Sequence, residues 1–482
     1  MVERIINRDM ICYFFLVTIL GLYSWLISIH TMPIPDGWYI YYGKCMEQGN
    51  LPYRDFEYLF TPLYIYIMGG IYGVFSTTII YYKFLGVVIY CLIGTVVFKI
   101  LKLLFTRLGA FIGTIVSVLY LQTEVAQVFY DYVRVMDLFA LLSTYSILLI
   151  IKGYNDKKNP LKYYIAAGVY IALFTLIKQN MGLIFLAYSI VALLIVNKYY
   201  KNTIQNVWKC ILAFMLSYLM PILLGIFMLS ISGSYDAFIE GSTKDALAAK
   251  GGWSAVLFGW IFRLPPILYD QWQVVLAILL MFCVIYFYKD VIEKYKDKSN
   301  IDILWFFSVV MIGFFILEKH GGLAHRFEWS IYISPYYIFF IVFPIFVWMC
   351  VSVLYDIKNN NKTYKNISLL ALIGAYEAIS YGCGTSGGLA EGQATLGMGF
   401  LCASTIDCLY MKRVLLVRCM LIAMFSLLTL QLMDRKMVHT YYWWESNESN
   451  YWLAKSYSDI PAMKGVMLSE ETKKLYEGCI MI

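Results

Sequence analysis

The residues of this chain best suited to chemistry lie in one aromatic stretch that follows the first long apolar segment. Asp36 opens the run Asp-Gly-Trp-Tyr, Leu51 opens Leu-Pro-Tyr-Arg-Asp-Phe, and Thr61 opens Thr-Pro-Leu-Tyr. A carboxylate is costly to place at a membrane surface, so its presence there indicates a use. It could take a proton from a hydroxyl, bind a metal ion, or cap the helix that follows. These roles are compatible, because a carboxylate fixed at a helix start is already oriented.

A second group of ionisable residues, Asp131, Arg134 and Asp137, lies at the end of an apolar hairpin. Ionisable side chains within a span are functional candidates by default. Residues three apart on a helix can also pair with each other, so an ion pair within the group is an equally good interpretation. If Asp131 lies near Asp36, the second carboxylate could bind a cation or hold an acceptor hydroxyl.

Cations suited to a phosphate group occur at two further places. Lys178-Gln179-Asn180 interrupts two apolar runs, where Lys178 could act as a point charge on a phosphate or extend its ammonium to the membrane surface. The segment 318–328 is the densest ionisable cluster and contains His320, His325, Arg326 and Glu328. Arg326 could bind phosphate through two parallel hydrogen bonds. The two histidines could join Asp36 on a metal, although no standard zinc spacing is present.

Composition defines the class of protein that must position these residues. The chain has 482 residues, of which 61% are hydrophobic and only 14% are charged, more apolar surface than a soluble fold of this size can bury. The basic residues are dispersed over loops, which excludes a nucleic-acid reading surface. The cysteines are scattered in apolar segments without a CxxC pair, which is typical of small core residues. The chain is therefore predicted to be an all-α polytopic membrane protein.

Hydropathy predicts about 13 transmembrane helices. The predicted spans lie near 11–30, 84–101, 109–123, 135–151, 161–177, 181–197, 207–231, 272–288, 302–317, 331–354, 366–380, 392–410 and 414–432. The apolar segment 62–75 is too short to cross the membrane, since 14 residues of helix rise only about 21 Å. Treating it as interfacial places the lysine-rich loops and the N-terminus on the cytoplasmic side and Asp36 on the outer side.

The first outer loop is predicted to contain interfacial helices. After Pro33 and Pro35, Trp38, Tyr41, Tyr42 and Cys45 recur with helical spacing on one face, and Gly49-Asn50 ends the run. Thr61-Pro62 reads as a helix cap followed by proline at the first helical position. Residues 1–432 form the predicted transmembrane domain, and 433–482 form a short outer tail that packs on it.

The first outer loop resembles that of membrane glycosyltransferases with the GT-C fold. The resemblance rests on Asp-Gly-Trp-Tyr from Asp36, Gly-Asn-Leu-Pro-Tyr-Arg-Asp-Phe from Gly49, and Thr-Pro-Leu-Tyr from Thr61. The most similar are bacterial members of the dolichyl-phosphate-mannose protein mannosyltransferase type, glycosyltransferase family 39 and its neighbours. The match covers 31–85, with weaker similarity at 134–137, 178–180 and 460–474. Many members have Glu where this chain has Gly37. If that Glu is a second metal ligand, its absence weakens the case for a metal ion, and the metal question stays open.

The resemblance implies an inverting enzyme that takes a sugar from a polyprenyl-phosphate donor outside the cytoplasmic leaflet. By resemblance, Asp36 would be the catalytic acidic residue, and Asp131 is the second catalytic candidate. The predicted substrate-binding residues are Tyr39, Tyr64, Arg134, Asp137, Lys178, Gln179, Arg326 and Glu328. The metal candidates are Asp36, His320 and His325, and a divalent metal ion is the one cofactor considered.

The expected partners are the lipid-linked sugar, membrane lipid and a glycan, lipid or protein acceptor. Two alternatives stay open. One is a polysaccharide polymerase or ligase that uses a pyrophosphate-linked glycan. The other is a flippase or transporter of lipid-linked sugars, which would line a central path with charge rather than gather it at one face.

Overall fold

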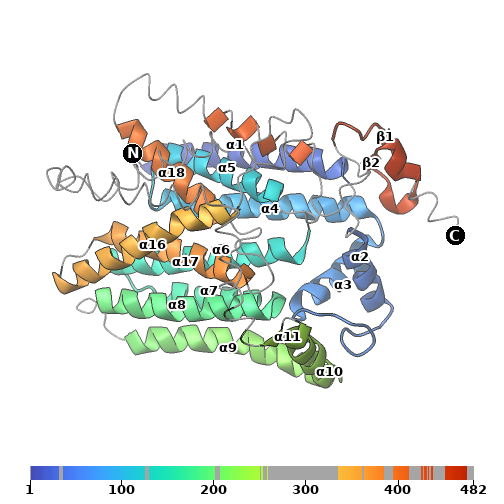
Figure 1. The fold of residues 1–482 in the computed structure, drawn as a ribbon, viewed down its shortest axis with the longest axis horizontal. Helices are drawn as coiled ribbons and strands as arrows, with labels where there is room; N and C mark the ends of the chain where they lie inside the picture. The colour runs from blue at the N-terminus through green and yellow to red at the C-terminus, as the bar shows by residue number, and fades with distance from the viewer. Residues whose placement is uncertain are drawn as a thin grey trace. The chain divides into compact units, whose positions relative to one another are not determined.

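The computed structural model describes most of the N-terminal half of the chain and parts of the remainder. The described residues are 2–31, 36–124, 130–200, 207–249, 251–252, 254, 258, 335–360, 363–384, 395–411, pieces of 425–437, and 451–474. Within them the protein is mostly helical (Figure 1). The prediction of a helical membrane protein is confirmed in this coarse form for the described part of the chain. The predicted spans at 272–288 and 302–317, and most of 414–432, lie outside the described residues.

The helices follow one another with short connections. The first nine are α1 (Val2–Ile29), α2 (Asp36–Glu47), α3 (Leu63–Phe75), α4 (Ile79–Lys102), α5 (Arg107–Glu124), α6 (Tyr132–Asn155), α7 (Leu161–Ile177), α8 (Gln179–Tyr199) and α9 (Val207–Ile231). They are followed by α10 (Tyr235–Ile239), the π-helix η1 (Glu240–Asp245), α11 (Ala246–Ala249), α16 (Pro335–Lys358), α17 (Tyr364–Gly384) and α18 (Thr395–Met411). The C-terminal segment contains β1 (Ser456–Tyr457), the 3-10 helix η3 (Pro461–Met463) and β2 (Met467–Leu468).

Five of the described helical segments are long and apolar enough to cross a membrane. They are Asp9–Ile29, Ile79–Lys102, Tyr132–Asn155, Gln179–Tyr199 and Trp208–Ile231. Shorter apolar helices cover Leu63–Phe75, Arg107–Gln122, Leu161–Ile177 and Leu396–Asp407. The prediction of a multi-pass chain is therefore confirmed in its coarse form, and the count of about 13 spans stays a prediction.

The chain divides into two compact units, and the boundary passes through α4. One unit comprises Met1–Val96, Val125–Trp253 and Arg435–Ile482, and the other comprises Val97–Glu124 and Ser254–Asp434. In the first unit, α6, α7, α8 and α9 run alongside one another (Figure 1). In the second unit, α18 packs on α5, and the carboxylate of Asp407 accepts hydrogen bonds from the backbone N–H and the hydroxyl of Thr106, the residue before α5.

The C-terminal segment belongs to the first unit. Strands β1 and β2 pair antiparallel, with Ser456 opposite Leu468. The ring of Tyr451 lies 4.8 Å from the ring of His30 just after α1, and Gly465 lies against Ile80 at the start of α4. The segment thus packs where α1 ends and α4 begins.

The segment predicted to be the first outer loop contains the two predicted helices, with differences at their edges. α2 begins at Asp36 and ends before Gly49, whose φ of 86° suits glycine. Trp38 and Tyr41 are exposed, whereas Ile40, Gly43 and Cys45 are buried, so the predicted aromatic face is split. The predicted cap at Thr61 is wrong: Pro62 precedes α3 without a side-chain cap, and the Thr61 hydroxyl instead donates 2.8 Å to the Thr175 carbonyl oxygen.

Helix α3 is short and packs closely on α2. Its 13 residues rise about 20 Å, less than the ~30 Å hydrocarbon core, as the sequence predicts. A Cβ added at Gly69 of α3 would lie 2.9 Å from the Cβ of Met46, and one added at Gly43 of α2 would lie 2.8 Å from the Cβ of Tyr72. The helix pair that carries Asp36 therefore depends on the absence of side chains at its contact.

We expect Gly69→Ala to lower the unfolding temperature of the detergent-solubilised protein, because the new methyl group must push α2 away from α3. Gly70→Ala is the matched control, since a Cβ there meets nothing within 4 Å. The control should be neutral or stabilising by about 0.5–1 kcal/mol through helix propensity. Equal unfolding temperatures for the two variants would contradict this account of the packing.

Candidate functional site

The ends of several helices in the first unit meet with the first outer loop. Because successive long helices alternate in direction, the end of α7 lies beside the starts of α6 and α8, and α2 and α3 lie at that same end (Figure 1). The Tyr64 hydroxyl donates 2.5 Å to the Tyr130 carbonyl oxygen before α6, and the Gln179 amide N–H donates 2.8 Å to the Ser242 carbonyl oxygen in η1. The segments predicted to carry chemistry in this unit thus converge at one end of the helices.

Asp131 is the buried carboxylate at this end. Only 3% of its surface is exposed, and its side chain caps α6 by accepting a 3.3 Å hydrogen bond from the Val133 N–H. Its Oδ1 also accepts a 2.9 Å hydrogen bond from the Tyr39 hydroxyl of α2. Burial raises the pKa of Asp131 to about 6, against the opposing effects of the Tyr39 hydrogen bond, Arg134, the Val133 N–H and Lys178.

Tyr39 connects the helix that begins with Asp36 to Asp131. Burial and the neighbouring Asp131 carboxylate raise the pKa of the Tyr39 phenol well above its usual value, so the phenol stays protonated and can donate. On a helix, positions three apart lie on one face, which places position 36 one turn before Tyr39. The backbone of Asp36 is the start of α2, and its side chain lies outside the described part of the structure.

Lys178 lies at the junction between α7 and α8, as the sequence predicts. Its backbone is extended, with φ −149° and ψ 103°, and it is the one residue between the end of α7 and the start of α8. Its Nζ is 5.7 Å from the ring centroid of Phe60 and 5.6 Å from that of Tyr132, which is the geometry of a cation–π contact. The ammonium is therefore held over two aromatic faces, close enough to Asp131 to lower the pKa of its carboxyl.

The α7–α8 junction is tight because of Gly182. A Cβ at this position would lie 2.3 Å from the Cα of Thr175, so the two helices touch backbone to backbone. Thr175 is also the residue whose carbonyl oxygen receives the Thr61 hydroxyl. The first outer loop and the Lys178 junction are thus held at a defined separation.

Arg134 and Asp137 form the ion pair that the sequence left open. The guanidinium Nη1 donates 2.9 Å to Asp137 Oδ2, and both side chains are almost fully buried. The guanidinium carbon also lies 5.8 Å from the ring centroid of Tyr90 on α4. Removing either partner alone would leave an uncompensated buried charge, so the pair is a structural necessity whatever else it does.

An aromatic cluster surrounds Asp131 and Lys178. The Tyr39 ring lies 5.3 Å from Tyr64, 6.5 Å from Tyr130 and 6.4 Å from Tyr132, and the rings of Phe60 and Tyr132 are 4.5 Å apart. Tyr39 and Tyr64 were predicted to bind substrate. Phe60, Tyr130 and Tyr132 were not predicted, although the density of aromatic residues on both sides of the hairpin was the available signal.

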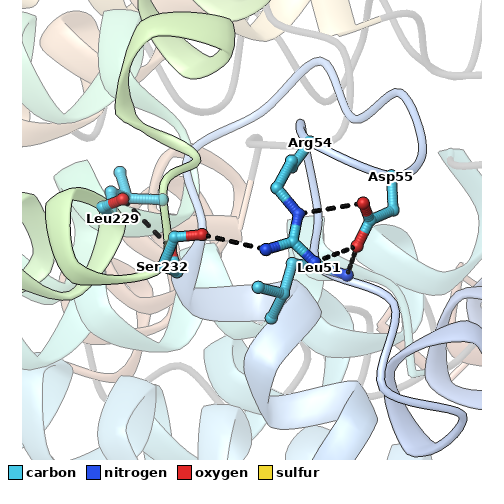
Figure 2. A network of polar contacts seen from close by, with 5 residues as sticks. All are labelled: Leu51, Arg54, Asp55, Leu229 and Ser232. Carbon is cyan, nitrogen blue, oxygen red and sulfur yellow. Dashed lines mark hydrogen bonds and ion pairs between the residues drawn. The ribbon is translucent and has the colours of Figure 1, made fainter.

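Arg54 joins the first outer loop to the end of α9. Its Nε and Nη2 donate to Asp55 at 2.9 and 2.8 Å, and its Nη1 reaches the Ser232 carbonyl oxygen at 3.4 Å (Figure 2). Arg54 and the hydrogen bond from the Leu51 N–H lower the pKa of Asp55 to about 2. The contact is exposed, so it contributes orientation more than stability.

The remaining candidates lie outside the described residues. Arg326, Glu328, His320 and His325 belong to this group. Within the described part, no group of three or more His, Cys, Asp or Glu side chains could hold a metal ion. Asp131 Oδ1 accepts hydrogen bonds from Tyr39 and Val133, and Asp137 Oδ2 accepts one from Arg134.

Comparison with known proteins gives structural similarity only. No protein-family model matches the chain, and no curated protein sequence matches it. One similar solved structure is the archaeal oligosaccharyltransferase AglB from Archaeoglobus fulgidus in complex with an inhibitory peptide and a dolichol-phosphate. It has a TM-score of 0.42 and 14% identity, over 88% of this chain and 55% of that chain.

Two further structures of the oligosaccharyltransferase from the same organism are similar. The complex with Zn and sulfate has a TM-score of 0.47 and 16% identity, over 87% of this chain and 52% of that chain. The form tethered to an acceptor peptide has a TM-score of 0.42 and 14% identity, over 88% and 55%. This chain spans about half the length of these proteins. At such identities and TM-scores, the matches assign it neither a fold family nor a substrate.

The raised pKa of Asp131 predicts a dependence of stability on pH. The folded pKa, about 6, lies above the ordinary 3.8, so between these values the folded state binds the proton more tightly than the unfolded state. The free energy of unfolding should therefore fall as the pH rises from about 4 to about 6. Asp131→Asn should flatten this part of the profile of unfolding temperature against pH.

Glu47→Gln, at the exposed last residue of α2, is the control for this measurement. It should leave the profile as in the wild type. Tyr39→Phe should steepen it, because losing a donor to the ionised carboxylate raises the pKa of Asp131 further. An Asp131→Asn profile parallel to that of the wild type would contradict the assignment.

Proposed function

We propose that this chain is a GT-C glycosyltransferase that moves a sugar from a polyprenyl-phosphate donor to an acceptor hydroxyl on the extracytoplasmic side, with inversion. The observation that carries the proposal is the hydrogen bond from Tyr39 to Asp131 beside the ammonium of Lys178. It ties the helix that starts with Asp36 to a buried carboxylate and a cation, which are the groups that glycosyl transfer from a phosphate requires. The resemblance of the first outer loop to that family supports the same conclusion.

In the proposed reaction, the acceptor oxygen attacks the anomeric carbon from the face opposite the lipid phosphate. The bond between the anomeric carbon and the phosphate oxygen breaks, and both of its electrons leave with the phosphate. The proton of the acceptor hydroxyl passes to the Asp36 carboxylate. Asp131, whose pKa of about 6 is near the working pH of most enzymes, orients the acceptor or shares that proton.

The departing phosphate gains negative charge, so cations aimed at it lower the barrier. Lys178 is the described residue best placed for this role, because two aromatic faces hold its ammonium. Arg134 lies in the first turn of α6, close to Asp131, and is paired with Asp137. Its positive charge adds to that of Lys178 in stabilising the phosphate. Arg326 is a further proposed phosphate ligand, and Glu328 a proposed substrate contact.

The short helix α3 provides the proposed platform at the membrane surface. Being too short to span, it keeps the loop that follows Asp36 on the same side as Lys178. The donor's lipid tail would remain in the membrane between helices, while its phosphate and sugar reach the aromatic cluster. This arrangement corresponds to the predicted outer location of the chemistry, with the N-terminus in the cytoplasm.

The identity of the released lipid separates this function from its alternatives. A monosaccharide-lipid donor leaves polyprenyl phosphate, whereas a polymerase or ligase with a pyrophosphate-linked glycan leaves polyprenyl pyrophosphate. A flippase releases neither and moves labelled lipid across liposomes without breaking a bond. Ionisable side chains gathered at one end of the helices favour the enzyme over the transporter.

We expect Asp36→Asn to reduce sugar transfer from a polyprenyl-phosphate donor by a factor of about 10² or more, because the amide cannot accept the proton. The assay follows labelled sugar in purified, detergent-solubilised protein, alongside its unfolding temperature. Glu47→Gln, on the same helix, should retain activity. Near-normal turnover of Asp36→Asn with an unchanged unfolding temperature would exclude the base role.

Lys178→Met keeps the length of the side chain and removes its charge. The turnover number should fall about 10²-fold while the unfolding temperature changes little, because the lost interaction is strongest with the departing phosphate. Lys198→Met, at the exposed opposite end of α8, is the matched control. Lys178→Arg should recover part of the activity. If both methionine variants behave alike, Lys178 does not act on the phosphate.

A further inference from the structure

Three buried polar atoms near the site have no hydrogen-bond partner within the described part of the chain. They are the hydroxyl of Tyr58, the amide oxygen of Gln179 and the hydroxyl of Ser234. Tyr58 is 5% exposed and Ser234 is fully buried. Buried polar groups in folded proteins are nearly always paired, so three unpaired ones in one region call for an explanation.

Contacts connect each of the three residues to Phe238 of α10, directly for Ser234 and through one intervening residue for Tyr58 and Gln179. The Tyr53 ring lies 6.0 Å from the Tyr58 ring and 5.1 Å from the Phe238 ring. The Ser234 carbonyl oxygen accepts a 2.9 Å hydrogen bond from the Phe238 N–H. The hydroxyl of Ser242 donates to the Phe238 carbonyl oxygen, and the Ser242 carbonyl oxygen accepts a hydrogen bond from the Gln179 amide N–H. The three residues therefore belong to one chain of contacts at the interface between segment 48–62 and segment 232–245.

The chemistry of this interface fits a hydroxyl-rich ring. The three groups without a described partner are a phenol, an amide oxygen and an alcohol, all neutral. All three can accept hydrogen bonds from hydroxyls, and the phenol and the alcohol can also donate. Aromatic rings lie among them, and their negative faces suit the C–H groups of a sugar. A phosphate would need cations, and the guanidinium at the edge of this interface, that of Arg54, is already paired with the carboxylate of Asp55.

We propose that the interface of segments 48–62 and 232–245 is a sugar-binding subsite, in which Tyr58, Gln179 and Ser234 bind the hydroxyls of a glycosyl group. The inference rests on the proposed function and adds the residues that determine its sugar specificity. The glycosyl group comes from the donor or from the acceptor. It enters where the exposed contact from Arg54 to Ser232 closes the edge of the interface (Figure 2).

The conformation of Tyr53 fits this assignment. Its φ of 71° lies in the left-handed region, which non-glycine residues rarely adopt, and its hydroxyl donates to the Phe60 carbonyl oxygen. Backbone of this kind persists where surrounding contacts hold it and is concentrated at ligand-binding segments. Tyr53 thus keeps the aromatic wall in place between Tyr58 and Phe238.

Tyr58→Phe and Ser234→Ala test the proposal, because each removes one unpaired hydroxyl and leaves the packing nearly unchanged. Binding is measured by the shift in unfolding temperature with three probes: polyprenyl-phosphate mannose, polyprenyl phosphate without sugar, and methyl mannoside. Glucose, galactose and arabinose versions of the sugar probes are included. Tyr81→Phe, on an exposed ring of α4, is the control.

Each variant should weaken binding of one sugar-bearing probe by about five- to tenfold and leave bare polyprenyl phosphate unaffected. The unfolding temperature without ligand should stay or rise, because an unpaired buried hydroxyl is lost. Loss confined to the lipid-linked sugar assigns the subsite to the donor, and loss confined to the methyl glycoside assigns it to the acceptor.

The proposal is overturned if the wild type binds no sugar-bearing probe better than bare polyprenyl phosphate. It is also overturned if both variants bind every probe as the wild type does. The same holds if their binding of bare polyprenyl phosphate falls as much as their binding of the sugar-bearing probes. Sugar transfer is assayed separately. If the wild type transfers sugar and both variants bind all probes normally, the subsite is rejected and the proposed enzyme activity is kept. If the wild type transfers no sugar but the variants lose binding of a sugar-bearing probe alone, the subsite is kept and the proposed enzyme activity is rejected.

Discussion

The hydrogen bond between the Tyr39 hydroxyl and the Asp131 carboxylate is the interaction on which the candidate site depends. It joins α2 to the start of α6 across 92 residues of chain. Asp131 is buried, so its ionised form survives only with donors, and Tyr39 and the Val133 N–H supply them. The same bond sets the orientation of the helix that begins with Asp36. The orientation of α2 and the protonation state of Asp131 therefore both depend on the phenol of Tyr39.

Close helix packing makes that bond geometrically possible. α2 and α3 approach at Gly43 and Gly69, and α7 and α8 approach at Gly182, where a side chain would collide with the neighbouring helix. These contacts bring the first outer loop against Thr175 and Lys178. Charges in the region are consistently compensated: Arg134 by Asp137, and Lys178 by two aromatic faces and the nearby Asp131. An apolar protein can keep so many ionisable groups in one place only with such pairing.

Much of the helical framework was predictable because apolar length is a local property. The segments 161–177, 207–231 and 62–75 were predicted within a residue of α7, α9 and α3. The Lys178 junction followed from a polar triplet between two apolar runs. The cap at Thr61 was predicted wrongly, because a hydroxyl before a proline can equally bond a distant carbonyl, and Thr175 provides one. The predicted aromatic face of α2 was split, because the tight contact at Gly43 selects which side is buried.

The sequence by itself determined the class of chain, the positions of its apolar helices and the residue types available for chemistry, since all three follow from composition and spacing. Only the tertiary structure decided which of those residues meet. It joined Tyr39 to Asp131, paired Arg134 with Asp137, and left Tyr58, Gln179 and Ser234 with buried polar atoms that have no partner among the described residues. The physical reason is that burial and hydrogen-bond partners depend on residues far apart in the chain, so no local pattern specifies them.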